Sequence, residues 1–396
     1  MPRIYMDANA TTPLLPEVFE AMRPFWMEHY GNASSIHQQG QQARGAVEMA
    51  RGAVARFLHC LNSEIVFTSG GTESDNLALF GVLSKTAEPA HLITTTIEHH
   101  AVLHAAESLA KNNVEVTFLP STAQGLIEPA ALKAAIRHNT RLVSIMYANN
   151  ETGVIQPIPE LAAIAHKAGA LFHTDAVQAS GKLPLDLSAE GPLKNVDLLT
   201  LSGHKLYAPK GIGVLFVRRN VRLAPMLHGG THERQRRAGT ENVACIAGLG
   251  KAAELATAWL NTTAPSELTA LRDRFERGLL AQIDECGING GSAPRVSNTS
   301  NLYFDHLEAE ALVIALDLKG ISASGGSACQ SGAAEPSHVL TAMGLPPARA
   351  RASIRFSLSR LTTEEEIDET LKIIPAAVAR LRELSPAWRK QVPVEA

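Results

Sequence analysis

The sequence predicts an α/β protein, with a large domain built on a seven-stranded, mainly parallel sheet and a small α+β domain after it. Between about residues 15 and 260, short apolar runs alternate with segments of helical spacing. Such alternation is typical of a parallel sheet covered by helices on both faces. After residue 260 the pattern changes to long helices separated by few strands. A length of 396 residues also exceeds one ordinary core and fits two domains.

The strands of the large domain are predicted from short runs rich in Val, Ile, Leu and Thr. These runs are Glu64–Thr68, His91–Thr96, Val114–Leu119, Leu142–Tyr147, Ala170–Thr174, Asp197–Leu201 and Gly211–Val217. Alanine-rich segments between them have helical spacing, namely Ser74–Lys85, Ala101–Lys111 and Glu160–Lys167.

The small domain is predicted to begin with a helix capped by Ser266 and running to about Cys286. A strand at Thr299–Phe304, a helix at Glu308–Lys319 and a strand at Ala352–Leu358 follow. A last long helix is expected to start near Thr363, because the three acids after it favour a helix N-terminus.

Composition excludes several classes of protein. The formal net charge is −3 and the basic residues are scattered, so we expect no nucleic-acid partner. The sequence has no uninterrupted apolar run of about 18 residues and no signal-peptide pattern at its start, so we expect a cytoplasmic protein without a membrane partner. The cysteines Cys60, Cys245, Cys286 and Cys329 form no CxxC pair. Neither a structural zinc site nor a disulfide framework is therefore expected.

Three predicted strands end in residues that carry chemistry. Ser69–Ser74 is a glycine-containing turn that opens a helix, where free N–H groups can hold a phosphate. Asp175 and Lys205 follow two other strands. Taken singly, these features fit an ordinary turn, a helix cap and a surface lysine. Taken together, they supply the phosphate anchor, the carboxylate and the amine that pyridoxal 5′-phosphate (PLP) chemistry requires.

The chain resembles the class V aminotransferase-type PLP enzymes of fold type I and, among them, the cysteine desulfurases of the NifS/IscS family. Matching motifs run in order through nearly the whole chain. They are Asp7–Pro13, Tyr30–Ser35, Thr68–Asn76, Glu98–Val102, Asn149–Gly153, Asp175–Gln178, Ser202–Gly211, Arg237–Asn242, Ser327–Cys329 and Arg355–Ser357. Ala33 and Gln330 depart from the common family pattern.

The resemblance also implies a domain division and a branch of the family. Residues 15–260 would form the large PLP-binding domain, and residues 1–14 with 261–396 the small one. Four stretches resemble the nitrogenase-associated NifS branch more than the housekeeping branch. They are Ala148–Gly153, His173–Gln178, Arg237–Asn242 and Leu384–Trp388.

The resemblance further implies roles for individual residues. Lys205 would hold PLP covalently, Asp175 would pair with the pyridine nitrogen, and His99 would stack on the ring and relay protons. Gln178 and Asn150 would lie near the phenolic oxygen. The phosphate would be bound by Gly71, Thr72, Ser202 and His204, and by Thr240 of the neighbouring subunit in a homodimer.

The substrate implied is L-cysteine, with its carboxylate gripped by Arg355 and helped by Asn32. Cys329 would take the substrate sulfur as a persulfide, and L-alanine would leave. Small residues surround Cys329, as expected for an exposed carrier thiol. The sulfur acceptor would be an iron–sulfur scaffold protein, NifU-like or IscU-like. No metal is expected in the apoenzyme, although Cys329 can serve as a ligand of a transient iron–sulfur cluster.

Three alternatives remain open. Another PLP enzyme of the same fold, such as a selenocysteine lyase, an aminotransferase or a kynureninase-like hydrolase, does not need a thiol at Cys329. A non-catalytic scaffold of this fold would not need Lys205 and Asp175. A metal-binding protein using His99, His100 and His104 would lack an evident further ligand.

Overall fold

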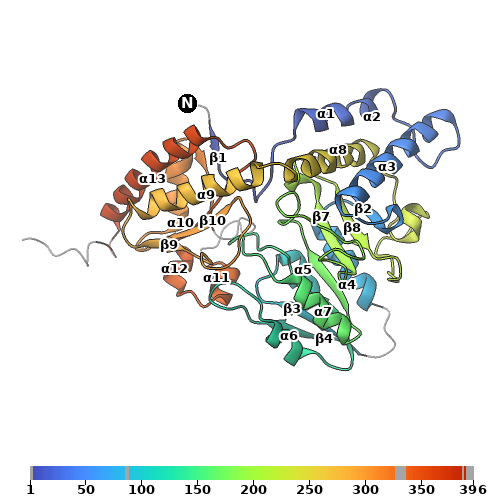
Figure 1. Ribbon diagram of the computed structural model, residues 1–396, viewed down its shortest axis with the longest axis horizontal. Coiled ribbons are helices and arrows are strands. Elements are labelled where there is room, and N and C mark those ends of the chain that lie inside the picture. The colour runs from blue at the N-terminus through green and yellow to red at the C-terminus, as the bar shows by residue number, and fades with distance from the viewer. Residues whose placement is uncertain (1–2, 85–88, 326–335, 386–387, 389–396) are drawn as a thin grey trace, which may run out of the picture.

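The structure is a computed structural model that describes residues 3–84, 89–325, 336–385 and 388 (Figure 1). Its largest sheet has seven strands in the order β2-β8-β7-β6-β5-β3-β4. β8 is antiparallel to both of its neighbours, and the other pairs are parallel. The predicted α/β class and mainly parallel sheet are therefore confirmed. The strands are β2 (Ile65–Thr68), β3 (Ala90–Thr95), β4 (Val114–Leu119), β5 (Thr140–Ser144), β6 (Leu171–Asp175), β7 (Leu198–Ser202) and β8 (Gly213–Val217).

The two faces of this sheet are covered by different helices. Alternate side chains of a strand point to opposite faces, so Val66 and Phe67 of β2 belong to different hydrophobic clusters. One face packs against α3 (Gln38–Phe57), α7 (Ile158–Lys167) and α8 (Val243–Leu260). The other packs against α4 (Gly71–Leu83) and α5 (His100–Ala110). Both faces are therefore dry, as a mainly parallel sheet requires.

A second sheet lies at the other end of the molecule, on the left of Figure 1. Its order is β12-β13-β10-β9, and all of its pairs are antiparallel. Its hydrophobic cluster is separate from those of the large sheet. The division into domains at residues 15 and 260 stays a prediction, which this separate cluster supports. The elements are β9 (Cys286–Ile288), β10 (Thr299–Phe304), β12 (Ser324–Gly325) and β13 (Ser353–Ser357), with α9 (Ala264–Leu280), α10 (Ala309–Leu318) and α13 (Glu364–Leu384).

The N-terminal segment joins this second sheet. β1 (Ile4–Tyr5) pairs in parallel with β11 (Ile321–Ser322), and the backbone N–H of Ala8 donates to the carbonyl of Ser357 at 3.0 Å. The chain then passes Asn9, which is buried, before α1 begins. The first residues thus run between the two sheets.

Two expectations at the start of the small domain are wrong. The first helix is preceded by Thr263 rather than capped by Ser266, because Pro265 occupies its first turn, where proline fits well. That helix ends at Leu280, and Cys286 begins strand β9 instead. The last helix is as expected, because Thr363 and Glu366 form a capping box before α13.

Shorter elements complete the chain. They are α1 (Pro16–Met22), α2 (Pro24–Met27), α6 (Pro129–Ala135), α11 (His338–Ala342), α12 (Pro347–Arg351), and the 3-10 turns η1 (Asn62–Glu64), η2 (Gly203–Lys205) and η3 (His232–Gln235).

In the described part of the chain, only α8 is long and apolar enough to cross a membrane, judged by length and composition alone. It carries Lys251 and Glu254 and buries one face against α3 in the core. Core helices pass the same test, so α8 is weak evidence for a membrane span.

Candidate active site

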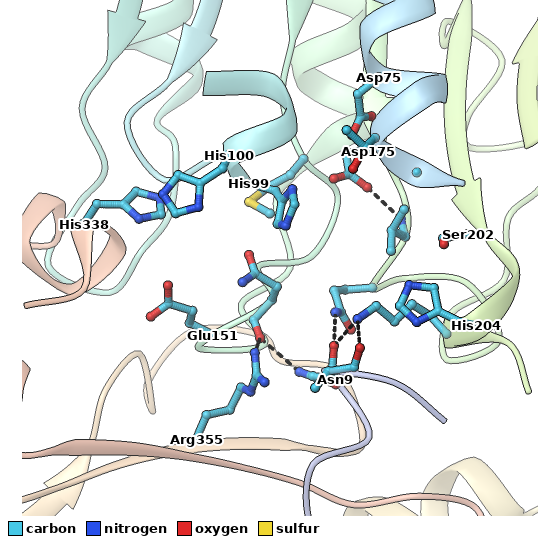
Figure 2. Close-up of a pocket in the computed structure, with 18 residues that line it drawn as sticks. Asn9, Asp75, His99, His100, Glu151, Asp175, Ser202, His204, His338 and Arg355 are labelled. Carbon is cyan, nitrogen blue, oxygen red and sulfur yellow. Dashed lines mark hydrogen bonds between the residues drawn. The ribbon is translucent and has the colours of Figure 1, made fainter. Parts of the chain in front are cut away.

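Five loops at one edge of the large sheet surround a cavity of about 380 Å³. They follow β2, β3, β5, β6 and β7, which run in the same direction, so their carboxyl ends meet. Ligands bind at this edge in open α/β sheets. Figure 2 shows that Arg355 enters the cavity from the opposite side, on the second sheet, and that Asn9 arrives on the N-terminal segment.

Asp175 is the last residue of β6 and lies on the cavity wall. Its Oδ1 accepts a hydrogen bond from the Val177 N–H at 2.8 Å. Burial raises the pKa of Asp175 to about 6, and the Val177 N–H and the charge of Lys205 oppose that rise. The carboxylate is thus poised to pair with a buried cation.

Two further carboxyl groups lie beside Asp175, and the sequence motifs gave no reason to expect them. Asp75 of α4 is buried, and its Oδ1 makes no hydrogen bond within the described residues. Its pKa is well above the usual range because of burial and then the charge of Asp175. Burial also raises the pKa of Glu98 to about 8. Burial and the neighbouring carboxyl charge thus favour the protonated forms of Asp75 and Glu98, whereas the charge of Lys205 favours the ionised form of Asp175.

His99 precedes α5 and caps it, because its Nδ1 accepts from the Ala101 N–H at 3.1 Å. Burial, followed by the nearby His100 and Lys205, lowers the pKa of His99 to about 4. The ring is therefore neutral near pH 7. Since Nδ1 is the acceptor, the proton is on Nε2.

Lys205 ends the short turn after β7, next to Asp175 on the cavity wall. Its Nζ donates to the carbonyl oxygen of Ala10 at 2.6 Å and to that of Asn9. The amine is thus held at the cavity by backbone oxygens of the N-terminal segment.

The four residues predicted to bind phosphate are together. Gly71, Thr72, Ser202 and His204 line both the cavity and an adjoining open hollow. A Cβ on Gly71 would lie 3.0 Å from Val177 Cγ2, so a larger residue at this position would crowd the phosphate hollow. The first N–H groups of α4 point here without intrahelical acceptors, as at any helix N-terminus.

Arg355 is 3% exposed and lies opposite these groups. Its Nη2 donates to Asp7 Oδ1 at 2.9 Å and its Nη1 to the Asn150 carbonyl at 3.1 Å. Within the described residues, Arg355 Nε and Asn150 Oδ1 are buried without a hydrogen-bond partner. Unsatisfied buried polar atoms are rare, so they indicate the position of a polar ligand.

Two of the predicted site residues that the structure describes are not brought to this cavity. Asn32 and Thr240 have exposed side chains, and Asn32 Oδ1 accepts instead from the Ser34 N–H at 2.8 Å. Cys329 lies outside the described residues.

Histidines do gather at the cavity mouth, but not around a common point. The His100 ring stacks on His104 at 5.0 Å and tilts against His338 at 4.7 Å between centroids. His338 donates through Nε2 to the Glu98 carbonyl at 2.9 Å. Over residues 3–84, 89–325, 336–385 and 388, no group of three or more His, Cys, Asp or Glu residues is placed to hold a metal ion.

Asn9 is the residue that the sequence analysis missed most clearly. It is 2% exposed and lines the cavity, and its backbone and side chain together bond to Lys205, Gln178, Asn150 and Ser357. The motif Asp7–Pro13 was noticed, but an asparagine in a loop has no sequence signal of its own. Its role follows only from contacts with residues about 140 to 350 positions away in the chain.

Comparisons with known proteins agree on the family. A family model described as Aminotransferase class-V matches residues 4–370. A cysteine desulfurase of Trichormus azollae is 51% identical over 383 residues, which covers 97% of this chain and 94% of that protein. The cysteine desulfurase NifS of Azotobacter vinelandii is 46% identical over 396 residues, which covers 100% of this chain and 97% of that protein.

Solved structures are similar over the same length. A NifS-like protein superimposes with a TM-score of 0.88 at 37% identity, covering 96% of this chain and 100% of its own. A structure described as SspA in complex with cysteine superimposes with a TM-score of 0.80 at 38% identity, covering 91% of this chain and 100% of its own.

Proposed function

The chain belongs to the class-V aminotransferase family and, within it, to the cysteine desulfurases, and from that premise we propose that it takes sulfur from L-cysteine and carries it on Cys329. The observation that carries the proposal furthest is the pairing of Lys205 and Asp175 at neighbouring strand ends of one cavity. The carrier role of Cys329 rests on the family motif Ser327–Cys329.

PLP is the cofactor of this family, and the cavity's residues fit it. They supply an amine at Lys205, a buried carboxylate at Asp175 and a phosphate-sized hollow next to the α4 N-terminus. Asn150 Oδ1 and Arg355 Nε are left for a ligand to satisfy. When bound, PLP supplies an electron sink for the bonds at the substrate Cα.

The chain's own residues then position groups and move protons. Asp175 would stabilise a protonated pyridine nitrogen. The resulting ion pair would offset the effect of burial, which raises the pKa of Asp175. Lys205 takes and returns the proton at the substrate Cα. His99 offers Nε2–H to the cavity, and its low pKa keeps the ring uncharged beside Lys205. Gln178 and Asn150 act at the phenolic oxygen.

Arg355 binds the substrate carboxylate. Asp7 and the Asn150 carbonyl hold two of its nitrogens, which fixes the plane of the guanidinium group and leaves Nε for the ligand. The thiolate of Cys329 forms an S–S bond with the substrate sulfur as the substrate C–S bond breaks. The carbon receives a proton, and L-alanine leaves.

We further propose that the enzyme is a homodimer in which Thr240 reaches the partner's phosphate hollow and Asn32 the partner's substrate site. Both side chains are exposed in one chain. Large apolar side chains near Asn32 are exposed as well, with Met27 at 73%, Tyr30 at 71% and Ile36 at 93%. Exposed apolar surface of this kind is typical of an interface.

The cellular role is proposed from the family as well. The sulfur would pass to an iron–sulfur scaffold protein in the cytoplasm, NifU-like if the chain serves nitrogenase and IscU-like otherwise. An aminotransferase or selenocysteine lyase is the second candidate. The Ser327–Cys329 motif disfavours it, because those reactions need no carrier thiol.

The test is an assay of sulfide and alanine from L-cysteine with PLP and a reductant. Wild type is compared with Cys329→Ala and Lys205→Ala, and with Cys286→Ala and Lys194→Ala as matched controls outside the cavity. We expect equal sulfide and alanine from wild type and both controls, and loss of both products in the two site variants. Full activity of Cys329→Ala on L-cysteine would exclude it as the carrier and favour the second candidate.

A further inference from the structure

A second lysine, Lys182, lies behind the cavity wall and belongs to none of the family motifs. Gln178 and Asn9 line the cavity, whereas Lys182 lines a smaller space behind them, with Lys205, Tyr207 and Arg360. Lys182 therefore reaches the cofactor site only through the residues it bonds to.

Lys182 fixes the orientation of the Gln178 amide. Its Nζ donates to Gln178 Oε1 at 2.8 Å, and Gln178 Nε2 donates to the Asn9 carbonyl at 3.0 Å. Turning the amide over would set its oxygen against the Asn9 carbonyl oxygen and its NH₂ against the amine of Lys182. The contact with Asn9 would then set two oxygens against each other, so the observed orientation is favoured.

The same amine holds the side chain of Asn9. Asn9 Oδ1 accepts from Lys182 Nζ at 3.2 Å and from Asn298 Nδ2 at 3.1 Å. Its Nδ2 is thereby directed to Thr299 Oγ1 at 2.9 Å and to the Asn150 carbonyl at 3.1 Å. One amine thus orients two amides, and both belong to the cavity wall.

The charge environment suits this task. Burial and then the positive charges of Lys205, Arg355 and Arg360 hold the pKa of Lys182 well below its usual range. Lys182 is in no ion pair with a described acidic residue at 4.0 Å or less. A lysine amine donates hydrogen bonds in either protonation state, and the lowered pKa reduces the positive charge that Lys182 adds next to Lys205.

We propose that Lys182 is a positioning residue of the cofactor site, which holds the Gln178 and Asn9 amides so that Gln178 turns its second N–H into the cavity. The site then offers a donor, not an acceptor, to an anionic oxygen such as the phenolate of PLP. This inference rests on the proposed PLP function. It adds that Lys182 determines whether Gln178 presents a hydrogen-bond donor or an acceptor to the cofactor.

The test is a double-mutant cycle on the full-length protein. Lys182→Met, Gln178→Ala and the double variant are reconstituted with PLP, and Lys194→Met is the control for loss of a lysine elsewhere. We expect Lys182→Met to weaken PLP binding about tenfold, the scale of one misplaced hydrogen bond. We also expect Lys182→Met to shift the absorption maximum of the bound cofactor. In the Gln178→Ala background, Lys182→Met weakens PLP binding much less than tenfold, because the Gln178 contact is already absent and only Asn9 loses its support.

Lys182→Gln serves as a rescue, since its side-chain NH₂ can still donate to Gln178 Oε1. Lys182→Ala replaces Lys182→Met if that variant does not fold. Additive losses in the double variant, or a cofactor spectrum unchanged in Lys182→Met, would overturn the proposal. A wild-type chain that binds no PLP would instead refute the proposed function, so the two failures are distinguishable.

Discussion

The cavity floor and the segment 226–242 are built in opposite ways. The floor, formed by Asp175, His99 and Lys205, has its polar groups bonded within the same chain. Asp175 and His99 accept from N–H groups of their own loops, and Lys205 donates to the N-terminal segment. Segment 226–242 is fixed at its base, where Glu233 accepts two hydrogen bonds from Arg51 at 2.8 and 2.9 Å. Its end, at Thr240, is exposed.

A second ion pair joins segment 226–242 to the phosphate hollow. Arg237 donates to the two carboxylate oxygens of Glu73 at 2.8 and 3.2 Å, and Glu73 stands in the first turn of α4. The base of the segment is thus rigid while Thr240 points outward. The exposed end of this segment agrees with the proposed homodimer, in which Thr240 would act at the partner's phosphate hollow.

The largest expected effect is at the floor. Asp175→Asn keeps the shape of the side chain and removes the charge that balances a protonated pyridine nitrogen. We expect kcat on L-cysteine to fall about a thousandfold, as when a charge-stabilising group is removed. The measurement is steady-state sulfide release, with the surface variant Asp317→Asn as control. Near wild-type turnover in Asp175→Asn would show that the carboxylate of Asp175 matters no more to the reaction than the surface carboxylate of Asp317.

The second effect is a pH dependence of stability that arises from Glu98, a buried carboxyl group beside Asp175. The pKa of Glu98 is raised from 4.5 to about 8 by burial, so the folded chain keeps a proton that the unfolded chain releases. The free energy of unfolding therefore falls as pH rises from about 4.5 towards 8.

Glu98→Gln mimics the protonated carboxyl and removes this contribution. When the pH rises by two units within this window, we expect the free energy of unfolding to fall by about 2 kcal/mol more for the wild-type apoprotein than for Glu98→Gln. Urea unfolding at several pH values measures it, with Glu383→Gln on the exposed face of α13 as control. Parallel stability profiles for Glu98→Gln and wild type would show that Glu98 is ionised in the folded protein.

The smallest effect belongs to segment 226–242. Thr240→Ala removes one hydroxyl, and we expect PLP binding to weaken about tenfold, the scale of one hydrogen bond to a charged group. Thr231→Ala, also exposed in this segment, is the control. Equilibrium titration of the apoenzyme with PLP gives the result at protein concentrations above and below dimer dissociation. If Thr240→Ala and Thr231→Ala bind PLP equally well, Thr240 does not complete a partner's site.

The sequence predicted the parts of the site that depend on local pattern. All seven strands of the large sheet lie within a few residues of their predicted ranges, because apolar runs between helical segments are a strong signal. Lys205, Asp175 and Gly71 could be placed at strand ends for the same reason. Motif order then identified the family.

What the sequence did not predict depends on contacts between distant segments. Asn9, Asp75 and Lys182 matter through partners brought together by the fold, and none has a distinctive spacing. The start of α9 was wrong for a local reason, because Ser266 looks like a cap but Pro265 already lies inside the helix. Asn32 and Thr240 show a further limit, since a single chain does not contain the surface against which they are proposed to act.

The path of the N-terminal segment has a consequence for biosynthesis. β1 pairs with β11 through Ile4 and Ile321, and Arg355 donates to Asp7, so residues made first depend on residues made last. The large sheet can form as it leaves the ribosome, since its strands lie between residues 65 and 217. The amine of Lys205, however, gains its two carbonyl acceptors only when residues 4–10 dock. A nascent chain stalled before residue 355 would have a complete large sheet but would lack the Arg355–Asp7 contact that holds the N-terminal segment at the cavity.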